Sequence, residues 1–301
     1  MGRLRELTAR FARVLELGEG ILEEISGAPL DGGAFERHLA FRWDVGRGPG
    51  RLVPIEEPQL FDLGDLVGVE SALERLVANT EQFASGHPSN HVLLFGERCT
   101  GKSSAVKGLL GRFGGRGLRM IEVHKDDLLH LPRVIEALRE APYRFVLFCD
   151  DLSFDAGESN FRELKAALEG SLAAPPENVR IYATSNRRHL LPHSRADNRA
   201  AHLDDAGELH LGEALEEKLA LSDRFGLVLG FYGFDQRTYL AIVERYARKA
   251  GVQADWTQVR EDALRWALDR SNRSGRTARQ FVNDLAGREA LAVTPPARPS
   301  E

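Results

Sequence analysis

The sequence predicts an α/β protein in which a parallel sheet carries a phosphate-binding loop and a helical region follows. Three stretches of the 301-residue chain support this fold class. An apolar run at 92–95 leads through a glycine-rich loop into a helical pattern, and a second apolar run at 145–149 ends in two aspartates. The last third, from residue 235, has helical periodicity. Unbroken apolar runs of this length are typical of strands that are buried on both faces.

The glycine-rich loop has the composition and spacing of a phosphate-binding loop. It matches the pattern G-x-x-x-x-G-K-[ST] with the residues Gly96, Glu97, Arg98, Cys99, Thr100, Gly101, Lys102 and Ser103. Backbone N–H groups of such a loop curl around a phosphate, and the helix start at Ser103 and Ser104 adds its positive dipole end. Lys102 can reach the β- and γ-phosphates, and the Ser103 hydroxyl can bind Mg²⁺.

The strand before the loop and the helix after it favour nucleotide binding over a chance glycine-rich turn. One position departs from the common form, because Cys99 stands where many such loops carry glycine. Its Cβ has to fit close to the phosphates, which affects the expected affinity more than the identity of the motif.

The second apolar run ends in Asp150 and Asp151. The carboxyl ends of parallel strands face the ligand crevice of an α/β sheet, so both carboxylates are expected there. We expect Asp150 to bind Mg²⁺ and Asp151 to orient or polarise an attacking water. An isolated match would more often be a strand that runs into an acidic loop, but its place after a phosphate-binding loop favours the functional interpretation.

A later apolar run, 179–183, is followed by Asn186, whose amide could bridge a γ-phosphate and the attacking water. The polar stretch 187–212 then contains four histidines, at positions 189, 193, 202 and 210. A zinc site is conceivable, but solvated loop histidines are favoured because no cysteine lies nearby.

Composition limits the remaining possibilities. The hydrophobic share is 43%, the charged share is 28%, and the net charge of −5 gives no general reason to expect nucleic acid. The two cysteines, Cys99 and Cys149, exclude a disulfide framework. No apolar run approaches the roughly 18 residues of a membrane span, and the start of the chain lacks the apolar segment of a signal peptide. We therefore expect a cytoplasmic protein.

Four regions are expected along the chain. Residues 1–58 form a small N-terminal module of a helix, at about 1–30, and a hairpin. Residues 59–232 form the nucleotide-binding core, and residues 233–291 form a helical domain. Residues 292–301 form a disordered tail that contains three prolines.

Taken together, these motifs resemble those of the AAA+ ATPases. The order along the chain is that of Walker A, Walker B, sensor 1, arginine finger and sensor 2, carried by Gly96–Ser103, Phe145–Asp151, Asn186, Arg224 and Gly275-Arg276. Longer stretches, at 120–128, 182–190 and 221–227, are similar to one bacterial AAA+ group that is described only as a domain of unknown function. The resemblance covers about residues 36–290.

The resemblance implies a P-loop NTPase fold of the AAA+ type. This fold has a five-stranded parallel sheet in the order 5-1-4-3-2 and a C-terminal helical lid. The resemblance also implies Mg-ATP as the ligand, a homo-oligomer as the assembly, and contact of Leu66, Val67 and Gly68 with adenine. It assigns sensor 1 to Asn186, the arginine finger that reaches a neighbouring subunit's ATP to Arg224, and sensor 2 to Arg276, with Arg279 as the alternative.

Two departures from the family pattern bear on function. Asp151 replaces the usual catalytic glutamate, as in proteins that resemble bacterial replication initiators and helicase loaders, so slow or partner-stimulated hydrolysis is expected. Residues 124–128 lack the aromatic-apolar-glycine pore loop of ring unfoldases, which counts against polypeptide threading. We expect an oligomeric ATPase that acts as a switch or remodeller of an unknown protein client. A nucleotide-gated binding module with negligible turnover and a DNA-associated initiator or loader stay open as alternatives.

Overall fold

The computed structural model describes residues 33–45, 50–153, 159–169, 176–186, 202–203, 209–210 and 223–293. The helix expected at about 1–30 lies outside these residues, as do positions 294–301 of the expected tail. Of the four loop histidines, those at 189 and 193 also lie outside. Those at 202 and 210 belong to a short antiparallel pair of strands, β7 (His202–Leu203) and β8 (Leu209–His210).

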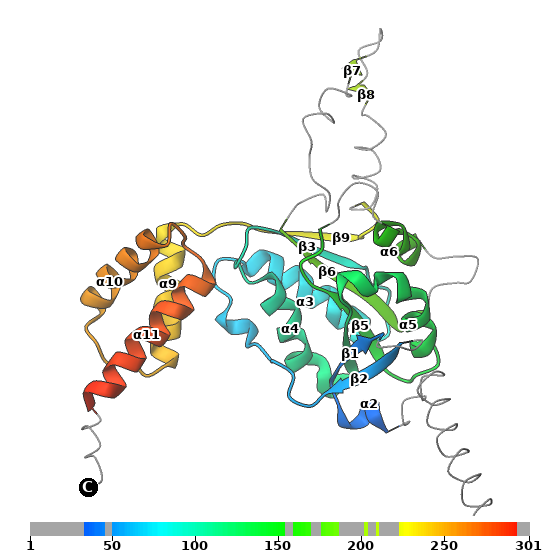
Figure 1. Cartoon of the computed structure of the whole chain (residues 1–301), viewed down its shortest axis with the longest axis horizontal. Coiled ribbons are helices and arrows are strands. Elements are labelled where there is room, and N and C mark those ends of the chain that lie inside the picture. The colour runs from blue at the N-terminus through cyan, green and yellow to red at the C-terminus, as the bar shows by residue number, and fades with distance from the viewer. Residues whose placement is uncertain are drawn as a thin grey trace, which may run out of the picture.

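A seven-stranded mixed sheet forms the centre of the described structure (Figure 1). Its neighbours in space follow the order β2-β1-β4-β5-β6-β3-β9. Each pair is parallel except β1 and β2, which are antiparallel. The strands are β1 (Ala40–Asp44), β2 (Arg51–Ile55), β3 (Val92–Gly96), β4 (Leu118–Glu122), β5 (Arg144–Cys149), β6 (Val179–Ser185) and β9 (Leu227–Phe231).

The expectation of a five-stranded, wholly parallel sheet is wrong. The hairpin of β1 and β2, which we expected in a separate N-terminal module, extends the same sheet, because β1 pairs in parallel with β4. Phe41 and Trp43 of β1 are almost fully buried as a result. A two-stranded hairpin is only marginally stable by itself, and the free edge of β4 offers unpaired backbone groups to which it can add. The remaining five strands are neighbours in the order β9-β3-β6-β5-β4.

Two hydrophobic cores cover the two faces of the sheet, because successive strand residues point to opposite sides. On one face, Phe145 and Leu147 pack with α5 (Leu131–Leu138) and α6 (Ser159–Glu169). On the other face, Val146 and Phe148 pack with α3 (Glu70–Ala84) and α4 (Lys102–Phe113). None of the helices in the described ranges is long and apolar enough to cross a membrane.

Three helices form a bundle with a core of its own beside the sheet (Figure 1). They are α9 (Gln236–Lys249), α10 (Trp256–Asp269) and α11 (Gly275–Val293), and we refer to them as the lid. Asp235 begins α9 by accepting a hydrogen bond from the Thr238 N–H at 2.7 Å. Residues 292 and 293, expected in the tail, are instead the last residues of α11.

The buried Arg119 side chain joins the short helix α2 (Ala34–Arg37) to the sheet. Its Nε donates to the Phe35 carbonyl at 2.5 Å, and its Nη1 donates to the carbonyls of Gly114 and Leu118 at 2.9 and 2.8 Å. The guanidinium also lies 4.5 Å from the centre of the Tyr143 ring. One buried guanidinium therefore donates hydrogen bonds to three backbone carbonyls that belong to separate segments of the chain.

We expect Arg119→Met to lower the free energy of unfolding by about 2–4 kcal/mol, because buried carbonyls lose a charged donor. Arg42→Met is the matched control, since the Arg42 side chain is 54% exposed and pairs with Glu122 at the surface. We expect this control to cost no more than about 1 kcal/mol. Urea denaturation measures both values, and equal losses would contradict the assigned role of Arg119.

Candidate nucleotide-binding site

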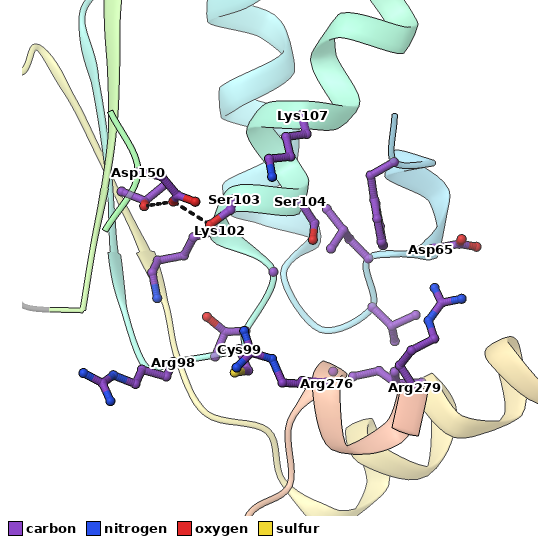
Figure 2. Close-up of a pocket in the computed structure, with 18 of the residues that line it drawn as sticks. Asp65, Arg98, Cys99, Lys102, Ser103, Ser104, Lys107, Asp150, Arg276 and Arg279 are labelled. Carbon is purple, nitrogen blue, oxygen red and sulfur yellow. Dashed lines mark hydrogen bonds between the residues drawn. The ribbon is translucent and has the colours of Figure 1, made fainter. Parts of the chain in front are cut away.

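A cavity of about 960 Å³ opens between the carboxyl edge of the sheet and the lid. Its walls come from the loop 98–104, the residues that follow β5 and β6, the segment 59–67, and the lid helices α9 and α11. Figure 2 shows side chains of the core and of the lid on opposite sides of this space. The cavity therefore lies where the sequence predicts the ligand crevice of an α/β sheet.

The loop between β3 and α4 needs residues that tolerate positive φ angles. Gly96 has φ of +136°, and a Cβ there would lie 1.8 Å from the Phe231 carbonyl oxygen on the neighbouring strand. Cys99 has φ of +62° and Gly101 has φ of +101°. The left-handed conformation of Cys99 explains why glycine is common at this position, since it costs a residue with a Cβ on the order of 1 kcal/mol.

Lys102 lies folded back into this loop. Its Nζ donates to the carbonyls of Gly96 and Glu97 at 3.0 and 2.6 Å and to Asn186 Oδ1 at 3.1 Å. The residue is only 6% exposed. Burial lowers the pKa of Lys102, and the opposing charge of Asp151 offsets this only in part. All three donors of the ammonium are thus already used, and a phosphate has to compete with these oxygens for them.

The aspartates after β5 lie at the same edge. Asp150 Oδ1 accepts hydrogen bonds from Ser103 Oγ at 2.7 Å and from Thr184 Oγ1 (Figure 2). The carboxylate of Asp151 accepts a hydrogen bond from the Asn186 amide. The structure therefore joins Ser103 to Asp150, and it joins Lys102 through Asn186 to Asp151. In the described part of the chain, no three His, Cys, Asp or Glu side chains gather as a metal site.

Apolar side chains line another part of the cavity wall. Leu66 and Val67 line it, as expected, together with four aromatic or aliphatic side chains that the sequence analysis did not identify, namely Phe61, Phe234, Ile242 and Tyr246. Gly68 does not line the cavity; it packs under the lid, where a Cβ would lie 2.4 Å from Thr238 Cγ2. Ile242 and Tyr246 carry the helical spacing of lid core residues, so no sequence signal marks them as cavity residues.

Arg276 and Arg279 of α11 both line the cavity. The Arg279 guanidinium lies 3.9 Å from the centre of the Tyr246 ring, and the N–H of Gly275 donates to the Cys99 carbonyl at 3.1 Å. The beginning of α11 is therefore bound to the phosphate-binding loop itself.

Arg224, which was expected to reach the ATP of a neighbouring subunit, lies outside the cavity of its own chain. It precedes β9, whose first residue, Leu227, lies opposite Val92 at the beginning of β3. The cavity lies at the other end of these strands, and Arg224 is not among the residues that line it. Gly96 and Glu97 also do not line the cavity; they turn the chain into it and supply carbonyls to Lys102.

The phosphate-binding loop, the two aspartates and the helical lid define this protein as an AAA+ P-loop NTPase by fold. The RuvB Holliday junction branch migration motor of Thermotoga maritima is similar at a TM-score of 0.50 and 17% identity, covering 77% of this chain and 65% of that chain. The Orc1 protein of Aeropyrum pernix, solved in complex with DNA, is similar at a TM-score of 0.54 and 16% identity, covering 76% of this chain and 62% of that chain. The chain thus spans less than two thirds of either length, and these likenesses show the fold alone.

The particular family is identified by its sequence model. Residues 36–289 match the family described as "Protein of unknown function (DUF815)", and the chain belongs to this family. A comparison with curated proteins finds no match.

The lid is also held to the core by a buried carboxylate. Asp65 is 5% exposed and accepts hydrogen bonds from Arg245 Nε at 3.2 Å and Lys249 Nζ at 2.6 Å, both on α9. Burial raises the pKa of Asp65, but the hydrogen bonds from Lys249 and Arg245 outweigh it and hold the pKa below the usual 3.8. The carboxylate therefore stabilises the folded state above this pH, and that contribution is lost as the pH falls through the lowered pKa.

We expect Asp65→Asn to lower the free energy of unfolding by about 1–2 kcal/mol at pH 7, a value reduced by the exposure of both cations. Asp62→Asn is the control, because Asp62 lies 3.5 Å from the same lysine but is 60% exposed, and asparagine keeps its oxygen for the Gly64 N–H. Denaturation across a pH series measures the effect. The difference between Asp65→Asn and the parent should shrink below pH 3.8, and a difference that does not change with pH would contradict the ionic role.

Proposed function

We propose that this protein binds Mg-ATP in the cavity and hydrolyses it, and that it works as an oligomeric switch or remodeller of a protein client. The observation that carries the proposal is the convergence of Lys102, Asn186 and the two aspartates in one part of a cavity that apolar side chains line in another part. Such a division suits a ligand with a charged polyphosphate and a flat base.

The cations of the cavity support an anionic ligand. Arg98, Lys107 and Arg276 line it, and the structure describes no side-chain hydrogen bond or ion pair of these three cations with another described residue. Among the described residues, the Lys102 ammonium donates to three oxygens, all of them neutral. These charges are compensated when phosphate groups enter the cavity, because phosphate oxygens accept charge-assisted hydrogen bonds from several donors at once.

The residues present also fit a magnesium ion. A hydroxyl and a carboxylate are ligands of the kind that Mg²⁺ takes from proteins while it keeps waters and phosphate oxygens, and Ser103 Oγ and Asp150 Oδ1 lie 2.7 Å apart. These two residues would hold the ion. When bound there, Mg²⁺ neutralises charge that develops on the phosphate oxygens.

We assign to Asp151 the orientation of the attacking water, and two hydrogen bonds support this assignment. Its carboxylate is bonded to Asn186, which also accepts from Lys102, so one amide links the phosphate-binding cation to the proposed base. Entry of a γ-phosphate draws Lys102 away from Asn186 and leaves the Asn186 Oδ1 free to accept a hydrogen bond from the attacking water. An aspartate reaches one methylene less far than a glutamate, which supports slow or partner-stimulated turnover.

The loop after β4 supports a switch rather than a threading motor. This segment forms a short 3-10 helix, η3 (Lys125–His130), that contacts α6 and buries Leu128 completely. The segment therefore packs into the hydrophobic core of the domain. It also lacks the aromatic residue with which unfoldases grip a polypeptide.

We expect Asp151→Asn to bind Mg-ATP within about threefold of the parent but to lose hydrolysis by about 10²–10⁴-fold, the usual contribution of a general base. Asp150→Asn is the companion variant, which should instead weaken the dependence of binding on Mg²⁺. Phosphate release and titration with labelled ATP measure the two properties. Hydrolysis by Asp151→Asn at the parental rate would show that another group activates the water. If the parent binds ATP but never turns it over at any concentration that favours association, the protein is a nucleotide-gated binding module.

The oligomer enters the proposal through Arg224, which lies outside the cavity of its own chain. A guanidinium supplied by a neighbouring subunit can neutralise the transition state, and such fingers contribute about 10³–10⁵ in rate in GTPase chemistry. Arg224→Ala should therefore bind ATP normally and hydrolyse it poorly.

Mixing two inactive variants tests whether this residue acts across an interface. Lys102→Ala keeps the finger but should bind ATP weakly, whereas Arg224→Ala binds ATP but lacks the finger. We expect hydrolysis to reappear in the mixture at concentrations at which subunits associate, because some interfaces then combine an intact cavity with an intact finger. A mixture that co-assembles, as checked by sedimentation, and stays inactive would exclude a role for Arg224 in trans.

A further inference from the structure

We propose that Thr184 is a positioning residue for both aspartates of the site and that, through Asp150, it sets the affinity for Mg²⁺. The identity of the ligand rests on the proposed function. The assignment of Thr184 rests on its hydrogen bonds, which join the end of β6 to the turn that follows β5.

The Thr184 hydroxyl bonds to both aspartates at once. Its Oγ1 donates to Asp150 Oδ1 and accepts the N–H of Asp151 at 2.9 Å. The Thr184 carbonyl also accepts the N–H of Leu152 at 2.7 Å. Thr184 is 1% exposed, so water has little access to replace these bonds.

The conformation of Asp151 requires such support. Its φ is +52°, a left-handed conformation that residues with a Cβ adopt only when the surroundings compensate. The Asp151 N–H also approaches Asp150 Oδ1, at 3.2 Å, but the shorter bond is the one to Thr184. The direction in which the Asp151 carboxylate points is therefore set in part by the Thr184 hydroxyl.

Asp150 is fixed by two hydroxyls that share one oxygen. Ser103 and Thr184 both donate to its Oδ1, and its Oδ2 makes no hydrogen bond with the residues that the structure describes. When hydrogen bonds hold one oxygen of a metal-binding carboxylate, its other oxygen has a defined position from which to bind the metal. Loss of such outer partners typically weakens metal affinity or activity by 10–100-fold.

The next residue provides a matched control. Ser185 is also fully buried on β6, and its hydroxyl donates to the Leu152 carbonyl at 2.7 Å. Within the described residues, the Ser185 hydroxyl thus anchors the same turn through Leu152, whereas the Thr184 hydroxyl bonds to the two aspartates. An effect that is seen for Thr184 and not for Ser185 separates positioning of the carboxylates from general support of the turn.

The experiment compares the full-length parent with Thr184→Val, Thr184→Ser and Ser185→Ala. Binding of a fluorescent ATP analogue is measured in EDTA and then during titration with MgCl₂. We expect all four proteins to bind within about twofold of each other in EDTA. The Mg²⁺ midpoint is the Mg²⁺ concentration that produces half of the change in nucleotide affinity. This midpoint should rise about tenfold or more in Thr184→Val. It should return to within about threefold of the parent in Thr184→Ser and stay at the parental value in Ser185→Ala. Thr184→Ala, which also removes the hydroxyl, gives the same comparison if Thr184→Val does not fold.

Two results would overturn the proposal while leaving the proposed function intact. One is an unchanged Mg²⁺ midpoint in Thr184→Val, and the other is an equal shift in Ser185→Ala, which would show general support of the turn. A parent protein whose nucleotide binding does not respond to Mg²⁺ would instead overturn both the proposed function and the role of Thr184. The parent and the variants therefore report separately on the two claims.

Discussion

The register of the sheet makes possible the hydrogen bond between Lys102 and Asn186. The rest of the site depends on this register and on this hydrogen bond. Phe95 of β3 lies opposite Ser185 of β6, so the chain leaves both strands at the same level. Cys149 of β5 lies opposite Ala183, which brings Asp150 next to Thr184. A shift of one residue in either pair would turn the side chains at these strand ends to the opposite face of the sheet. The hydrophobic cores on both faces prevent such a shift, and packing far from the cavity thereby sets the distances inside it.

A buried ammonium at this edge also stabilises the conformation of the loop. Lys102 would lose hydration without compensation, but the loop supplies two of its own carbonyls, and β6 supplies the amide oxygen of Asn186. Phosphate binding is then an exchange of acceptors rather than the creation of new ones. The gain in free energy comes from replacing neutral oxygens by charged ones, and the lowered pKa of Lys102 shows that the neutral oxygens and nearby carboxylates compensate the charge only in part.

Local patterns predicted the chemistry of the site, whereas contacts between distant segments decided the parts that were missed. The loop from Gly96 to Ser103 and the pair Asp150 and Asp151 are each short stretches whose meaning depends on the strand beside them. The sequence predicted a hairpin within residues 1–58, but no local signal states which edge it joins, since that depends on the free groups of β4. Tyr246 carries the spacing of a lid core residue and also faces the cavity. Thr184 looks like an ordinary strand residue until the register places it against both aspartates.

The two attachments of the lid lie directly beside residues of the cavity. Asp65, which binds Lys249 and Arg245 of α9, is followed in the chain by Leu66 and Val67 on the apolar wall. Gly275, which binds the Cys99 carbonyl, is followed by Arg276 on the polar side. A nucleotide bound as proposed would therefore lie beside both attachments, with its base near the first and its phosphates near the second. The first attachment is ionic and the second is a backbone hydrogen bond, so they respond to different parts of the ligand. In the proposed function, loss of the γ-phosphate would therefore act on the second attachment, at the beginning of α11.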